Sequence, residues 1–450
     1  MTTADPSLPS TSNSLSRVRR GTVLLVLGRL WGSACTFLAL WLLADQLSGD
    51  DFGRYTFYLA AFMLLDSFVD FGTGAIAVQR AADDEREIPE VLAATRRIRA
   101  VAGLLGVLIV GGGAFLANEP GAGWILLASL YPVTHVLELS ATIFRTRIAW
   151  KTPVAVRAFS SAASLAFVLL LIARGATEPG LYLCAVAAGS ASANILLHFV
   201  SRPHLPGGHA RHIPWRSVLV ASVPLGLAGL CQQTYFYVDN LFLRALVGRE
   251  ELGHYNVGVR MMSLSIMVGV YAALVALPWL RREFTAQRLG PAIARLAQPL
   301  FAIAAFSTGA LAPWSEHWLA IFGPEFSEAA PSLQWLFGAS ALVYVGAPSL
   351  TALVAIGNSG AVLRVALLGL FLNVVGNTLL IPQLGSQGAA IATFATEGGV
   401  VLGAFWCLQR AGVSQLGGAK PWRWALGPFL FGVGWVLSAA LPLSSIFTSF

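Results

Sequence analysis

Charged residues are scarce in this sequence of 450 residues: only 11% are Asp, Glu, Lys or Arg, against about a quarter in a typical soluble protein. The four cysteines, Cys35, Cys184, Cys231 and Cys407, have no metal-ligand spacing. Each lies in an apolar stretch, so we expect packed free thiols. The sequence also lacks a Gly-rich phosphate loop, a nucleophile elbow and a metal cluster, which argues against an enzyme, a metal site or a cofactor.

Long apolar blocks are abundant instead. Apolar residues make up 56% of the chain, and the mean hydropathy is +0.69. The blocks have about the length that a helix needs to cross a bilayer. They lie near residues 21–44, 54–78, 98–117, 122–145, 152–173, 180–200, 217–246, 256–280, 293–313, 333–356, 361–381, 387–408 and 424–446. The sequence therefore predicts an all-α polytopic membrane protein with 12–13 transmembrane helices, the thirteenth being the weakest because Pro and Gly interrupt it.

The basic residues indicate the topology. The net charge is +7, but most of the 29 Lys and Arg residues occupy the connections on the side of the N-terminus. The exceptions are Arg29 inside a span and, on the opposite side, Arg54, Arg174, Arg244, Arg249 and Arg260. This positive-inside pattern predicts a multi-pass protein of the plasma (inner) membrane with a cytoplasmic N-terminus. A nucleic-acid partner would require a basic soluble module, which the sequence lacks.

A short motif occurs twice, as "DFGRY" at 51–55 and as "ELGHY" at 251–255. Six predicted spans separate the copies and preserve their orientation, so the two halves are expected to be parallel repeats. We expect each copy to form an outward loop, in which Gly53 or Gly253 makes a sharp turn and Tyr55 or Tyr255 anchors at the membrane interface. The predicted parts are a disordered cytoplasmic tail, an N-terminal lobe, a C-terminal lobe and an extra hydrophobic segment, at residues 1–16, 17–205, 206–410 and 411–450.

Four stretches give the sequence a family resemblance. The stretch "LSGDDFGRYTFYLAAFMLLDSFVDFG" is similar to the opening of Wzx-type lipid-linked oligosaccharide flippases, in the multidrug/oligosaccharidyl-lipid/polysaccharide (MATE-like) superfamily. Signatures of later helical junctions in that family resemble "YVDNLFLRALVGREELGHYNVGVR", "IFGPEFSEAAPSLQWL" and "LLIPQLGSQGAAIAT". The resemblance implies two six-helix lobes around a central cavity that opens to either side in turn. It also implies transfer of a polyprenyl-diphosphate-linked (undecaprenyl) glycan to the outer leaflet. A lone thirteenth helix departs from the twelve or fourteen common in the family.

Such a transporter needs a wet cavity, with cations for the phosphates and hydrogen-bonding groups for the sugars. Polar residues inside spans are therefore the candidates for substrate binding. In the first lobe these are Arg29, Asp66, Asp70 and Glu138, and in the second lobe Gln232, Tyr235, Asp239 and Arg260. The spacing of Gln232, Tyr235 and Asp239 predicts one stripe on a helix.

Structural roles are the alternatives. Arg29–Asp70 and Asp239–Arg260 would then be ion pairs between helices. Near helix ends, the guanidinium group can instead reach the membrane interface, which is the alternative for Arg157 and Arg260. Hydrogen bonds between helices are the simpler role for Asn373, Asn377 and Glu397.

Other functions remain as alternatives at this point. A cation-coupled multidrug exporter of the same fold would favour an acidic and aromatic lining, whereas Arg29 suits an anionic headgroup. A scramblase, an exporter of another lipid, or an integral-membrane glycosyltransferase, polymerase or ligase are further alternatives. A carboxylate in the cavity would allow coupling to H+ or Na+. We expect a monomer in contact with membrane lipid.

Overall fold

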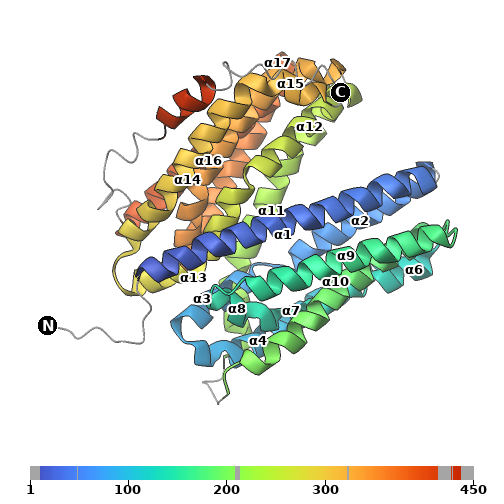
Figure 1. Ribbon diagram of the computed structural model, residues 1–450, viewed down its shortest axis with the longest axis horizontal. Helices are drawn as coiled ribbons and strands as arrows, with labels where there is room; N and C mark the ends of the chain where they lie inside the picture. The colour runs from blue at the N-terminus through green and yellow to red at the C-terminus, as the bar shows by residue number, and fades with distance from the viewer. Residues whose placement is uncertain are drawn as a thin grey trace. The chain divides into compact units, whose positions relative to one another are not determined.

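The computed structural model describes residues 11–47, 49–207, 213–321, 324–413, 427 and 429–436, and these form helices and no strand (Figure 1). The chain divides into two compact units, Met1–Gly226 and Leu227–Phe450. The division falls inside α11 (Trp215–Leu246), whereas the sequence places the lobe boundary at 205/206. The first turns of α11 belong to the first unit because Val218 and the preceding Ile213 pack in its apolar core.

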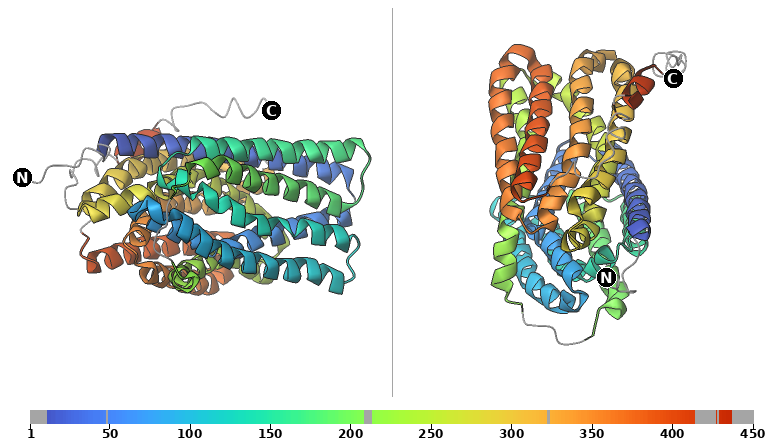
Figure 2. Two further views of the ribbon diagram at one scale, coloured as in Figure 1. Left: turned by 90° about the horizontal axis from the view of Figure 1, so that it is seen from below. Right: turned by 90° about the vertical axis from the view of Figure 1, so that its left-hand side faces the viewer.

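The first unit is a bundle in which the long helices α1, α9 and α10 run side by side (Figure 2). Its elements are α1 (Thr11–Gln46), α2 (Gly49–Asp70), α3 (Thr73–Asp83), η1 (Glu85–Glu87), α4 (Ile88–Val107), η2 (Leu108–Gly112), α5 (Gly113–Leu116), α6 (Ala122–Ala128), η3 (Tyr131–Thr134), α7 (His135–Glu138), η4 (Leu139–Ala141), α8 (Thr142–Thr146), α9 (Lys151–Ala173), α10 (Pro179–Ser201) and η5 (Arg202–His204). Residues 11–16, predicted to be disordered, belong to α1, and residues 1–10 lie outside the described part.

Two of the predicted spans in this unit are not continuous helices. The span predicted at 54–78 breaks between α2 and α3, where Phe71 and Gly72 have φ of 37° and 74°. The span predicted at 122–145 is a series of short α and 3-10 segments from α6 to α8, with Pro132 in the first turn of η3. Departures from α-helical geometry in mid-span free backbone groups and redirect side chains, and they are frequent at functional sites.

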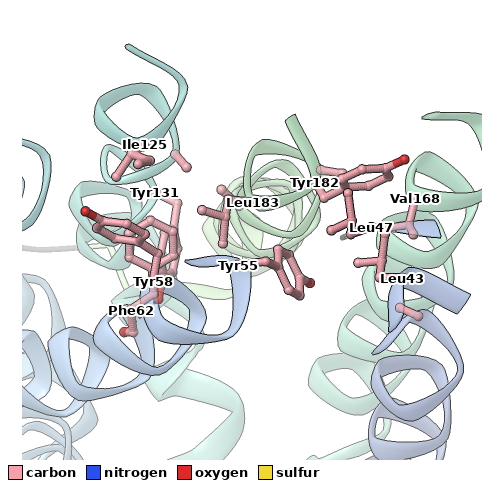
Figure 3. Close-up of a cluster of buried hydrophobic side chains, with 14 of the residues drawn as sticks. Leu43, Leu47, Tyr55, Tyr58, Phe62, Ile125, Tyr131, Val168, Tyr182 and Leu183 are labelled. Carbon is pink, nitrogen blue, oxygen red and sulfur yellow. Dashed lines mark hydrogen bonds between the residues drawn. The ribbon is translucent and has the colours of Figure 1, made fainter. Parts of the chain in front are cut away.

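A cluster of buried aromatic and aliphatic side chains stabilises the bundle of the first unit. Figure 3 shows Tyr58, Phe62 and Tyr131 on one side of Leu183, with Leu43 and its neighbours on the other. These side chains come from helices far apart in sequence and are at most 8% exposed. Burial of each large apolar side chain is worth about 1.5–3 kcal/mol, so the cluster fixes α2 against η3 and α10.

The second unit contains the remainder of α11 and long helices packed around α16 (Figure 1). Its other elements are α12 (Arg249–Ser265), α13 (Met267–Thr285), α14 (Leu289–Leu311), η6 (Ala312–Trp314), α15 (Ser315–Ala320), η7 (Pro324–Ala329), α16 (Ala330–Ala355) and α17 (Ser359–Arg410). The 52 residues of α17 double back at Gly385, which has non-helical φ and ψ of 55° and −134°. The connection between the spans predicted at 361–381 and 387–408 is therefore a kink at one residue, and Glu251 Oε1 accepts a hydrogen bond from Ser386 N there, at 2.6 Å.

The repeated motif lies in the same place in each unit, but not in a loop. "DFGRY" stands in the first turns of α2 and "ELGHY" in the first turns of α12, so Gly53 and Gly253 are helical and make no turn. Tyr55 and Tyr255 are both only 1% exposed and do not anchor at an interface. These three expectations were wrong because a short polar run next to Gly also starts a helix. The turn before α12 is made by Gly248, with φ of 133°.

The protein is an all-α polytopic membrane protein. Within the described ranges, nine helices are long and apolar enough to cross a membrane, or ten with the bent pair α12 and α13. The helix α17 counts once among these, although it spans two of the predicted segments. The predicted thirteenth span, 424–446, lies largely outside the described residues.

Candidate functional site

A polar network forms where the chain between α6 and α8 loses its helical regularity. His135 stands between two carboxylates: Nε2 is 3.0 Å from Asp66 Oδ1 and Nδ1 is 3.0 Å from Glu138 Oε2. Tyr131 donates its hydroxyl to the same Asp66 oxygen at 2.6 Å. A neutral imidazole donates from one nitrogen only, so these two contacts require either an imidazolium or a protonated carboxyl group.

Glu138 lies at the centre of the network, and only 8% of its side chain is exposed. Arg145 of α8 and Arg157 of α9 approach its Oε1 at 2.5 Å and 2.7 Å. Arg99 of α4 lies 3.9 Å from Oε2. A buried carboxylate requires such partners, because an uncompensated charge in the interior is very costly.

Arg99 was not among the candidates, yet it is the most buried cation of the network, with 2% exposure. It pairs with Asp70 and donates from Nε to Thr73 Oγ1 at 2.9 Å. The sequence placed it at the cytoplasmic end of the span predicted at 98–117, but α4 begins at Ile88, so Arg99 lies well inside this helix. Pro89 and Glu90 in the first turn were the signal for this earlier start.

The side chains of Asp70, Arg99 and Arg145 pack closely around Gly74. A β-carbon at this position would lie 2.9 Å from Asp70 Oδ1, 3.2 Å from Arg99 Nη2 and 3.6 Å from Arg145 Nη1. Glycine in the first turn of α3 thus leaves the space that the ion pair and its neighbour occupy.

Other sequence expectations for this unit need correction. Arg145 was assigned to a connection and Arg157 to the membrane interface, but both contact Glu138. The proposed Arg29–Asp70 pair is not observed: Asp70 pairs with Arg99, and Arg29 is exposed on α1. The structure brings Asp66, Asp70 and Glu138 together and leaves Arg29 out, because helix depth alone does not say which face points inward.

The second unit holds a separate polar group, centred on Asp239. This carboxylate is 3% exposed and accepts a hydrogen bond from Tyr255 Oη at 2.6 Å. The expected pair with Arg260 is also not observed, since Arg260 is exposed on α12. Nearby, Tyr235 donates to buried Glu397 at 3.3 Å.

The predicted stripe of α11 is only partly enclosed. Tyr235 and Asp239 are buried and line a small pocket with Tyr255, whereas Gln232 is exposed. On α17, Asn377 donates to Asn373 at 2.9 Å, and both side chains are fully buried. This Asn–Asn bond lies along one helix, so it is not the link between helices that the sequence suggested.

A bound metal ion would require several ligand side chains close together. Among the described residues, no three His, Cys, Asp or Glu side chains form a group that could hold a metal ion. All four cysteines are free thiols; Cys35 and Cys407 are buried, as expected for packed thiols, whereas Cys184 and Cys231 are only partly buried. The first unit instead offers guanidinium donors beside half-exposed carboxylates, which suits recognition of an anion and of hydroxyl groups.

Comparison with known proteins gives both a family and a fold. Residues 18–284 match the family model described as "Polysaccharide biosynthesis protein". No curated protein sequence matches significantly.

Solved structures of transporters are similar over nearly the whole chain. A mutant of the Vibrio cholerae MATE transporter VcmN superposes with a TM-score of 0.76 at 12% identity, covering 90% of this chain and 99% of that one. A MOP superfamily transporter from Pyrococcus furiosus superposes with a TM-score of 0.73 at 13% identity, covering 88% of this chain and 97% of that one. That structure is described as having a binding pocket of reverse polarity, which suggests a different function. At these identities the likeness shows the fold, which is that of MATE transporters.

Proposed function

This chain belongs to the polysaccharide biosynthesis protein family, and we propose that it flips a polyprenyl-diphosphate-linked oligosaccharide from the cytoplasmic to the outer leaflet by alternating access. The observation that carries the proposal is the group of cations inside the first unit. Arg99, Arg145 and Arg157 converge on Glu138 in helices that cross the membrane or border such helices. Ionisable residues are rare and usually functional there, and arginine is suited to phosphate.

The carboxylates at the edge of the network suit the sugar. The side chains of Asp66 and Asp70 are 43% and 48% exposed, so they have surface left for a ligand. We propose that they accept hydrogen bonds from sugar hydroxyl groups, while the lipid tail stays in the bilayer. Arg29, Gln232, Tyr235, Asp239 and Arg260 are kept as substrate contacts to be tested.

The setting completes the proposal. The protein would lie in the plasma membrane as a monomer, with its N-terminus in the cytoplasm. Coupling to H+ or Na+ would run through a carboxylate inside a span, such as Asp66 or Asp239.

Reconstituted vesicles test this function. A fluorescent polyprenyl-diphosphate-linked disaccharide is added, and its movement is followed with a quencher that does not cross the membrane, with and without an H+ or Na+ gradient. We expect movement with the wild-type protein and its loss in Arg29→Ala and Asp66→Asn, at equal amounts of inserted protein. Arg174→Ala, in the connection between α9 and α10, is the control. Normal movement in both variants would remove Arg29 and Asp66 from the site, and no movement with the wild type would refute the function.

A multidrug exporter coupled to cations is the second candidate. The buried carboxylates Asp239 and Glu397, together with the MATE fold, favour it. Efflux of a cationic dye from cells, abolished by Asp239→Asn and unaffected by loss of glycan synthesis, would support this alternative.

A further inference from the structure

Two arginines meet at one carboxylate oxygen in the first unit. Arg145 is in α8 and Arg157 in α9, and both reach Glu138 Oε1, at 2.5 Å and 2.7 Å. Glu138 is 8% exposed, whereas Arg145 is 30% and Arg157 48% exposed. The carboxylate is thus enclosed, and the two guanidinium groups that it holds are accessible.

Positive charge exceeds negative charge at this point. Arg99 is paired with Asp70 and His135 with Asp66, so Glu138 is left as one negative charge for Arg145 and Arg157. Each guanidinium has five N–H donors, and the contacts to Glu138 use only Nη2 of each arginine. Donors therefore remain for a second anion.

Building on the flippase function, we propose that Arg145 and Arg157 bind the two phosphoryl groups of the substrate's diphosphate, and that Glu138 is the positioning residue that keeps the two arginines adjacent. Two guanidinium groups repel each other, and a shared counter-charge holds them side by side. A diphosphate presents two neighbouring anionic groups, each of which matches one planar guanidinium fork. A monophosphate offers fewer anionic oxygens to the two forks, so we expect the site to bind the diphosphate more tightly than the monophosphate.

The position of the pair agrees with entry from the cytoplasmic leaflet. Arg157 is six residues after the start of α9 at Lys151, roughly 9 Å along a helix. By the positive-inside pattern, that end of α9 faces the cytoplasm.

Replacing Glu138 tests whether it positions the arginines or only repels an anion, because the two roles predict opposite changes in the affinity for diphosphate. If Glu138 merely placed a negative charge near an anion, Glu138→Gln would tighten diphosphate binding. If it positions the arginines, Glu138→Gln lets them move apart and weakens binding, and Glu138→Asp restores part of it.

The test is titration of the purified full-length protein with farnesyl diphosphate and farnesyl monophosphate. We expect wild type to prefer the diphosphate, and Arg145→Ala, Arg157→Ala and Glu138→Gln each to weaken diphosphate binding roughly tenfold, the loss of one charge-assisted contact. Because a buried change can unfold the protein, Arg157→Lys is added: it keeps the charge at an exposed position but loses the fork, and it should lower the preference for diphosphate. Glu283→Gln is the matched control in the second unit, where a carboxylate 5% exposed lies 3.2 Å from Arg288 and 3.5 Å from Arg295.

The outcomes distinguish the two proposals. Tighter binding by Glu138→Gln, or an unchanged diphosphate preference in the arginine variants, overturns this inference and leaves the flippase function standing. A wild-type protein that binds neither probe contradicts both, and one that binds the diphosphate but moves no lipid-linked sugar in vesicles contradicts the function alone.

Discussion

The internal repeat provides its own control for the buried hydrogen bond between Tyr255 and Asp239. Tyr255 and Tyr55 occupy the same place in the motif, both 1% exposed, but Tyr255 donates to a carboxylate. Position 39, which is 200 residues before Asp239, holds Ala39, so the first unit has no carboxylate there. Replacing each tyrosine by phenylalanine removes one hydroxyl from a matched apolar setting.

We expect Tyr255→Phe to destabilise the second unit by about 2 kcal/mol, because it removes a hydrogen bond to a charged, 3% exposed acceptor. For a unit of this size the midpoint of thermal unfolding should fall by about 4–8 °C. Tyr55→Phe should cost less than about 1 kcal/mol. Intrinsic fluorescence of the detergent-purified proteins measures both midpoints. Equal shifts in the two variants, or none in Tyr255→Phe, would refute the reasoning that the carboxylate makes the difference.

Three further predictions concern two glycines and the hydrogen bond from Ser386 N to Glu251. Gly74→Ala should lower stability by about 1–3 kcal/mol, because the added β-carbon crowds the Asp70–Arg99 pair. It should also lower sugar movement in vesicles. The control is Gly112→Ala, whose β-carbon would meet nothing within 4 Å and which should leave movement unchanged. Gly385→Ala should lower the unfolding midpoint through about 1–3 kcal/mol of backbone strain at a φ of 55°, and an unchanged midpoint would contradict the kink. Glu251→Gln should cost about 1 kcal/mol by weakening the bond to Ser386 N, and hydrogen exchange at the start of the second half of α17 should report it.

The membrane-spanning helices were predictable from hydropathy, because each apolar block must cross the bilayer as a helix. The breaks were less so. The sequence predicted one continuous span at 54–78, but Phe71 and Gly72 both have positive φ, and a β-carbon added at Gly72 would lie 2.7 Å from Leu225 Cβ in the first turns of α11. Tertiary contact of this kind leaves no periodic signal.

The carboxylates of the site could be predicted from the sequence, but the arginines that pair with them could not. Asp66, Asp70 and Glu138 stood out because acidic groups inside apolar runs are costly. Arg99 and Arg145 lay near predicted span ends, where arginine is common, and their partners are 29 and seven residues away. Choosing a partner for each required knowing which helices are neighbours.

The hairpin of α17 bears on how the chain is made. Only Gly385 departs from helical geometry between its two apolar halves, and only the short run "PQLGSQ" separates them as they leave the ribosome. The halves should enter the bilayer as one insertion unit. Substitutions at this position would therefore first change the yield of inserted protein during biosynthesis.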